Sequence, residues 1–300
     1  MNSASSTSSI SSASSTPATG WATQDADLRR GATILWTAVG AVVGAVVGFV
    51  SASVVGLVIG AIVLGAGGAV VAVSLVRRFV DSALSSVVAG IGARELDADG
   101  APRLFNLLQG LCATAGVSVP RVSVADDASI NVFVAADPSG EARAEVVVTR
   151  GFVDALERIE MEGAVAVCLA RLRSGLAEAQ TLAVALVAGE PWFIPGPARR
   201  RVIAAALSGQ AIFDADVKGV AITRYPPGLA AAFQRMIDTS TRVSGAVVDG
   251  NFLWLADPAG ESRNDAGAAP AGSRVEASGV RPNGDERPPL AERLALLREI

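Results

Sequence analysis

The sequence predicts an α+β fold in which an N-terminal two-helix transmembrane hairpin precedes a mainly helical domain with a small β-sheet. Three observations predict it: an uncharged run covers residues 31–76, three short β-like runs lie between 121 and 149, and apolar residues recur at helical spacing on both sides of them. We divide the 300 residues into a tail at 1–28, the hairpin at 29–78, a domain at 79–256, a linker at 257–286 and a terminal helix at 287–300.

The tail is rich in serine, threonine and alanine and has few large apolar side chains. Such a segment cannot bury enough surface to offset the entropy of ordering, so we expect it to be disordered. It lacks the basic start and the compact apolar stretch of a signal peptide.

As one helix, the uncharged run would be about 69 Å long, more than twice the roughly 30 Å of a bilayer's hydrocarbon core. Two spans joined by a turn at 51–53 fit better. The arginine pairs Arg29-Arg30 and Arg77-Arg78 stand at the outer ends, and no basic residue lies at the turn. Because positively charged flanks stay in the cytoplasm, we expect a multi-pass protein of the cell (plasma) membrane with both termini and the downstream domain in the cytoplasm.

Glycines recur on one face of each span. Gly40, Gly44 and Gly48 follow one another at every fourth residue, and Gly56, Gly60 and Gly68 share a phase in the second span. Small residues let lipid-embedded helices approach closely. We favour packing of the two spans on each other, with oligomerisation as the alternative.

The domain begins with an amphipathic helix, "RLFNLLQGLCATAGV", which ends at Gly116. The runs "RVSVA", "INVFVA" and "AEVVVT" then predict a small meander. Helices are expected over "EMEGAVAVCLARLRSG", "AIFDADVKGVAITRY", "PGLAAAFQRMID" and "PLAERLALLREI", and "NFLWLAD" is strand-like. The apolar stretch of Thr181–Pro197 is too short for a standard span, so we expect it to pack on the domain or to lie on the membrane surface.

Composition excludes several kinds of function. The chain has no histidine, which rules out a Ser-His-Asp triad, a Cys-His pair and an HExxH metal site. The two cysteines do not form the disulfide framework of a secreted domain. The basic residues are scattered and the net charge is -4, so we expect no nucleic-acid partner.

Six segments in order resemble the HtpX-like family of membrane-anchored zinc metallopeptidases. They are "PRVSVADDASINVFVAADP", "AEVVVTRGFVDALERIEMEGAVAVCLAR", "AIFDAD", "ITRYPPGL", "LWLADP" and "RPPLAERLALLR". The resemblance implies a metallopeptidase-like domain, with Asn131 at the family's asparagine and Asp216 at its supporting aspartate.

The resemblance also shows what has changed. The two zinc-binding histidines and the catalytic glutamate of HExxH correspond to Val167, Arg171 and Cys168, and the third ligand, a glutamate, corresponds to Ile212. A histidine near the C-terminus corresponds to Arg287. This degenerate member therefore lacks the ligands for zinc, the cofactor of the family, and we expect no metal and no cofactor.

A substitute metal centre would have to use Cys168, Asp214 and Asp216, which fall short of a closed tetrahedral set, and Arg171 would repel a cation. We interpret Cys168 as a small buried apolar residue rather than a reactive thiol. Arg171 is expected to pair with Asp216, Asp214 or Glu162 and so to replace the metal as a link between two helices. The alternative is an arginine on a solvated face.

The leading functional hypothesis is a catalytically inactive pseudo-peptidase with a binding or regulatory role in membrane protein quality control. Its expected partners are the lipid bilayer, membrane-protein clients or an active paralogue. The strand "AEVVVT" is a candidate edge for peptide addition, or else an ordinary strand of the sheet. The alternatives are an active zinc metalloendopeptidase with a non-standard ligand set and a purely structural membrane protein.

Overall fold

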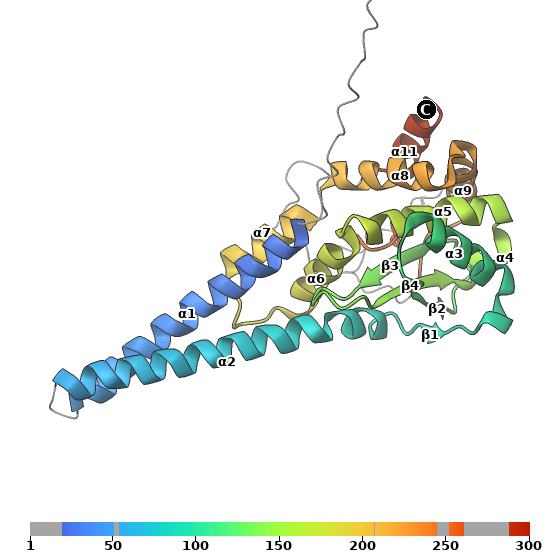
Figure 1. Ribbon diagram of the computed structural model, residues 1–300. Helices are drawn as coiled ribbons and strands as arrows, with labels where there is room; N and C mark the ends of the chain where they lie inside the picture. Colours follow the sequence, from blue (N-terminus) through green and yellow to red (C-terminus); the bar gives the residue numbers. More distant parts are fainter. Residues whose placement is uncertain (1–19, 51–53, 207, 245–251, 261–287) are drawn as a thin grey trace, which may run out of the picture.

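The computed structural model describes residues 20–50, 54–206, 208–244, 252–260 and 288–300 (Figure 1). It is mainly helical with a small mixed sheet, which confirms that part of the predicted fold class. The tail up to residue 19, most of the expected linker and Arg287 lie outside the described residues. The helices are α1 Gly20–Val50, α2 Val54–Ala89, α3 Pro102–Ala115, α4 Arg150–Ala155, α5 Arg158–Arg173, α6 Leu176–Gly189, α7 Gly196–Ala206, α8 Gly209–Thr223, α9 Pro226–Asp238 and α11 Leu290–Leu297.

Helices α1 and α2 run along each other away from the rest of the molecule (Figure 1). Within the described residues, one helical segment, 60–89, is long and apolar enough to cross a membrane, and the apolar part of α1, 30–46, is shorter. Helix α1 begins at Gly20, inside the expected tail, and α2 continues to Ala89, past the expected end of the hairpin at 78.

The glycines of α1 face α2. A Cβ atom added to Gly40 would lie 2.3 Å from the carbonyl oxygen of Leu64, and one added to Gly44 would lie 2.4 Å from that of Gly60. Because no side chain larger than hydrogen fits at such distances, these glycines set the close approach of the two helices. The described glycines therefore lie at the contact of α1 with α2.

The sheet has four strands, β1 Arg94–Glu95, β2 Arg121–Ala125, β3 Val132–Ala136 and β4 Ala144–Thr149, in the order β1-β2-β4-β3. Strand β4 pairs parallel with β2 and antiparallel with β3. The predicted meander is therefore wrong, and so is the interpretation of "AEVVVT" as an edge. Its pattern of continuous burial is that of a strand covered on both faces.

Both faces of the sheet are covered. Val132, Val134 and other apolar residues of the strands pack with α3, α5 and α9 in the main core. Phe133 and Val147 point to the other face, where α2 contributes Leu84 and Val87 and α6 contributes Val184.

The predicted strand "NFLWLAD" forms a single β-bridge, Phe133 to Trp254, beside the outer edge of β3. The two rings meet edge to face at 4.7 Å, and the Leu255 N–H donates to the Val132 carbonyl oxygen over 2.7 Å. The edge of β3 at these residues is therefore occupied by the protein's own chain.

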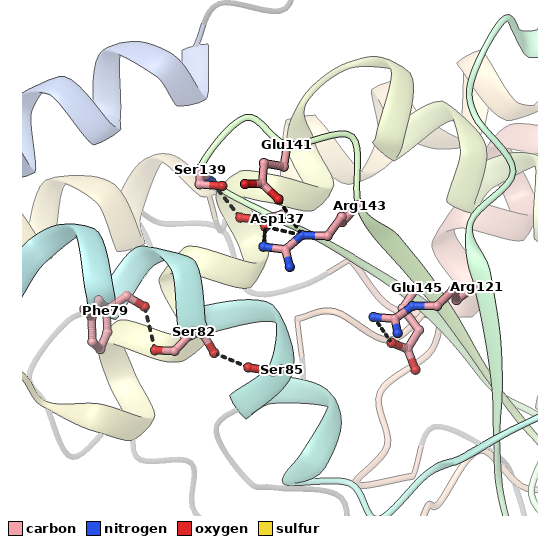
Figure 2. A network of polar contacts seen from close by, with 9 residues as sticks. All are labelled: Phe79, Ser82, Ser85, Arg121, Asp137, Ser139, Glu141, Arg143 and Glu145. Atoms are coloured by element: carbon pink, nitrogen blue, oxygen red, sulfur yellow. Dashed lines mark hydrogen bonds and ion pairs between the residues drawn. The ribbon is translucent and has the colours of Figure 1, made fainter.

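The turn between β3 and β4 is held by an ionic cluster (Figure 2). The buried carboxylate of Asp137 accepts hydrogen bonds from the Arg143 guanidinium and, over 2.8 Å, from the Ser139 N–H. Glu141 Oε2 lies 3.0 Å from Arg143 Nε, and both of these side chains are exposed to solvent. The hydrogen bond to Asp137 raises the pKa of Arg143, and the negative charges of Asp137 and Glu141 raise it further. Figure 2 also shows the pair Arg121–Glu145, which joins β2 to β4.

Helix α6 packs on the domain, as one of the two interpretations of Thr181–Pro197 predicts. Its contacts are with α1, α2, α5, α7 and β3. The Thr181 hydroxyl accepts a hydrogen bond from the Ala136 N–H over 3.0 Å and donates to the Ala177 carbonyl oxygen over 2.7 Å.

Glu178, in the first turn of α6, makes stability depend on pH. Burial raises the pKa of its carboxyl from 4.5 to about 7, and the described residues provide no hydrogen bond to its buried Oε2. Because the folded state holds the proton more tightly than the unfolded state, stability falls as pH rises from about 4.5 to about 7.

We therefore expect Glu178→Gln to raise the melting temperature at pH 8 and to leave it nearly unchanged at pH 4, where the native carboxyl is already protonated. Thermal unfolding of both proteins in one detergent at the two pH values measures this. Glu162→Gln, at a partly exposed position on α5, is the control. Equal gains at both pH values would contradict the assignment.

Candidate functional site

Helix α5 lies in the middle of the domain and contains the residues that the resemblance aligns with the HExxH motif. It starts where Glu157 and Glu160 form a capping box, with the Glu157 N–H donating to Glu160 Oε2 over 2.8 Å. Arg235 of α9 donates to Glu160 Oε1 over 2.9 Å and fixes this end. Helices α3, α6, α8 and α9 and strand β3 surround α5, so it is buried along most of its length.

The four positions at which the family's ligands and base are expected are all buried. Val167, Cys168 and Arg171 lie on α5 and Ile212 lies on α8. The two helices touch at Val167, because a Cβ atom added to Gly219 would lie 2.8 Å from Val167 Cγ2 and 2.9 Å from its Cα. Hydrocarbon packing against a glycine of α8 therefore surrounds the position that the resemblance assigns to the first ligand.

Arg171 is buried, so the interpretation of a solvated arginine is wrong. Its Nη1 donates to the Leu253 carbonyl oxygen over 2.7 Å. Asp214 is exposed and accepts a hydrogen bond from Gln210 over 3.0 Å, and Glu162 lines a small surface pocket with Tyr225.

The expected pair of Arg171 with Asp216 is also wrong, because another arginine takes the carboxylate. Arg293 of α11 donates from Nε and Nη2 to the two oxygens of Asp216, each over 2.7 Å. Its Nη1 donates to the Leu255 carbonyl oxygen over 2.6 Å, and its guanidinium lies 4.5 Å from the ring centre of Phe233. Both members of the pair are almost fully buried.

This bidentate pair links α8 to α11, which is the kind of cross-link that we expected between α5 and α8. A planar guanidinium with two parallel hydrogen bonds fixes both distance and orientation. The sequence contained one signal that pointed to Arg293. It stands in the apolar stripe Leu290, Arg293, Leu294, Leu297, whose four members are all buried.

Asn131, which the resemblance places at the family's asparagine, holds the chain beside β3. Its amide nitrogen donates to the carbonyl oxygens of Thr241 and Ala256 over 3.2 and 3.0 Å. Its amide oxygen accepts from the N–H groups of Val132 and Ala256 over 3.0 and 3.1 Å. All the hydrogen-bonding capacity of the amide is used in structure.

The residues present do not fit a zinc ion. Among the described residues, no group of three or more histidine, cysteine, aspartate or glutamate side chains could hold a metal. Of the potential ligands, Cys168 is enclosed, Asp214 is exposed and Asp216 gives both oxygens to Arg293. Zinc in proteins requires three or four such ligands that converge on one point.

Both thiols are protonated at neutral pH. Burial raises the pKa of Cys168 to about 11, against a smaller lowering by Arg171, and burial raises that of Cys112 to about 11. Since the thiolate is the reactive form, we expect neither cysteine to react with a maleimide at pH 7.5 in the native protein. Both should react after denaturation. Mass spectrometry of labelled peptides checks this, and rapid native labelling of Cys168 alone would revive the reactive-thiol interpretation.

Comparisons with known proteins find similarity over about three fifths of the chain. It is 29% identical over 198 residues to "Protease HtpX homolog" of Dictyoglomus thermophilum, covering 56% of this chain and 64% of the relative. A protein of the same description from Listeria monocytogenes is 26% identical over 242 residues, covering 65% and 79%, and one from Levilactobacillus brevis is 29% identical over 229 residues, covering 63% and 76%.

The chain thus spans less than two thirds of the length of the Dictyoglomus relative. No family model matches the chain. No solved structure matches it either.

Proposed function

Because the chain is an HtpX-like protein by sequence, we propose that it is a membrane-anchored, catalytically inactive homologue of HtpX-like metallopeptidases. It acts as a binding or regulatory pseudo-peptidase in membrane protein quality control. The observation that carries this proposal is the set of four buried side chains, Val167, Cys168, Arg171 and Ile212, at the positions of the ligands and the base.

Two features support loss of catalysis. A zinc ion lowers the pKa of its bound water from about 15.7 to about 7, and among the described residues no group of ligands could hold such an ion. The carboxylate of Asp216, which the resemblance assigns to support of a metal site, is held by Arg293. In this proposal, the aspartate that would support a metal site is instead part of a structural ion pair.

The membrane anchor is proposed from α1 and α2. The segment 60–89 of α2 has the length and apolarity of a membrane span. Helix α1 packs along it through glycine contacts typical of helices in lipid. A two-span hairpin with both termini and the domain in the cytoplasm agrees with the arginines at its outer ends.

Membrane-protein clients or an active paralogue are the proposed partners. Strand β4 is central and β3 is bridged by Trp254, so addition of a client strand to either would require local opening. Clients are therefore not expected to add a strand at β3 or β4, and the other edge of the sheet is the two-residue strand β1.

Zinc content tests the proposal. The protein, purified in detergent and dialysed against a weak chelator, should contain zinc far below one equivalent and should not cleave an unfolded membrane-protein substrate. The Listeria relative, prepared in parallel, controls for the protease assay.

Zinc near one equivalent, with proteolysis that Cys168→Ser or Asp214→Asn abolishes, would establish the alternative of an active metalloendopeptidase. Asp216 is unsuitable for this test, since its loss disturbs the ion pair with Arg293. Photo-crosslinking in membranes distinguishes a binding role from a purely structural one, which would yield no specific crosslinked partner.

A further inference from the structure

The turn between α6 and α7 carries Trp192, an apolar side chain that the domain leaves largely exposed. Between Glu190 and Arg199 the chain reads "PWFIPGPA", without a charge. Trp192 is 74% exposed, the most exposed large apolar side chain described. A single exposed apolar residue is common, but contiguous apolar surface marks a contact site, so the neighbours of Trp192 decide its meaning.

This turn lies against the membrane hairpin (Figure 1). The Trp192 ring meets Trp36 of α1 at 5.2 Å, and Phe193 meets Phe79 of α2 at 6.1 Å. Ile194 is buried with apolar residues of α1 and α2. The turn therefore lies along the hairpin between Trp36 and Phe79 and adjoins its apolar surface.

Trp36, the α1 contact of Trp192, lies at the depth expected for the boundary between headgroups and acyl chains. Trp36 lies six residues beyond Arg30, where the uncharged run begins, which is about 9 Å along a helix. Interfacial segments bury their apolar face by roughly 5–10 Å, and tryptophan is enriched at that depth. The charge on Glu190 limits the turn to the interface, because a carboxylate in the hydrocarbon core is costly.

Basic residues lie next to this surface. Helix α7 buries Val202, Ile203 and Ala206 against α6 and the hairpin, and carries Arg199, Arg200 and Arg201 in sequence. Positive charge near the N-terminal end of a helix does not stabilise that helix. In the described part of the chain these three arginines and Arg77-Arg78 form no ion pair.

We infer that the α6–α7 turn, residues 190–195, inserts into the cytoplasmic interface of an anionic lipid bilayer, with the arginines of α7 on the headgroups. This rests on the proposed membrane anchorage and adds a second contact with lipid. The juxtaposition of an exposed tryptophan, a membrane helix and unpaired arginines fits an anionic lipid surface by charge complementarity and by continuity with the apolar face of α1 and α2.

Site-directed labelling of the full chain tests the inference. Because the native thiols are buried and protonated, single cysteines introduced as Trp192→Cys and, to keep the tryptophan, Pro197→Cys can carry an environment-sensitive fluorophore. The matched controls are Val42→Cys on α1, where the native side chain is 64% exposed, and Val119→Cys before β2, where it is 54% exposed. The proteins are placed in vesicles of phosphatidylcholine and phosphatidylglycerol with brominated acyl chains.

We expect strong quenching at 192, 197 and 42, and none at 119. Quenching at 42 without quenching at 192 and 197 would overturn the inference about the turn and leave the proposed membrane anchorage intact. Absence of quenching at 42 as well would remove the membrane anchorage on which it rests. In vesicles of phosphatidylcholine alone, or with Arg199→Gln, Arg200→Gln and Arg201→Gln combined, quenching at 192 should fall. Equal quenching in both lipids would overturn the role of anionic headgroups.

Discussion

Replacing Arg293 with methionine should lower the free energy of unfolding by about 3–5 kcal/mol, the usual cost of removing one partner of a buried ion pair. The variant leaves the carboxylate of Asp216 buried without its guanidinium and removes a donor from the Leu255 carbonyl oxygen. The loss can be measured by denaturant unfolding in detergent, followed by circular dichroism.

The double variant Arg293→Met with Asp216→Leu should recover much of this loss, because an apolar pair of similar volume often replaces a buried ion pair without net destabilisation. Arg94→Met is the matched control. Its pair with Asp126, at 3.5 Å, is exposed on both sides and should contribute no more than about 1 kcal/mol. If Arg293→Met costs no more than Arg94→Met, the pair does not hold α11 on the domain.

Gly44→Leu should separate α1 from α2. Its Cβ would lie 2.4 Å from the Gly60 carbonyl oxygen and from the Ala61 Cα, so backbone atoms would have to move. Overpacking of a fitted interface costs typically about 1–3 kcal/mol and more where the backbone must shift. Titration with sodium dodecyl sulfate, followed by tryptophan fluorescence, reports on the stability of the helix pair.

Ala38→Leu, on the exposed side of α1, is the matched control and should have little effect. The oligomeric mass is measured for both variants. A changed mass in Gly44→Leu with unchanged stability would mean that the glycine face joins copies of the chain rather than the two helices of one copy.

The local elements could be predicted from sequence where a periodic pattern was strong. Leu104, Leu107, Leu108 and Leu111 located α3, and runs of valine located β2, β3 and β4. The order of the strands could not be predicted, because a strand that is buried along its length, such as β4, carries no mark that distinguishes its two neighbours. Strand β1 was missed because Arg94 and Glu95 are both exposed and have no apolar pattern.

At the candidate site, the resemblance assigned the ligand and base positions to Val167, Cys168, Arg171 and Ile212, and these four side chains are buried. The resemblance did not identify which residues form ion pairs with each other. The partner of Asp216 comes from 77 residues further along the chain, and nothing local to α8 indicates α11. An arginine in the middle of an apolar stripe was the available signal, and in α5 the same signal correctly marks Arg171 as buried.

Helix α2 joins the two halves of the protein without interruption. Its apolar segment runs directly into Val76 and Val80, which pack on α6, and then into Leu84 and Val87, which pack on the sheet. There is no glycine between Gly68 and Gly90 and no proline anywhere in α2 to act as a hinge. If α2 spans the membrane as proposed, we expect a change in its tilt, such as a thicker or thinner bilayer imposes on a membrane helix, to turn the sheet and α6 together with it, so that the domain would respond to the thickness of the bilayer.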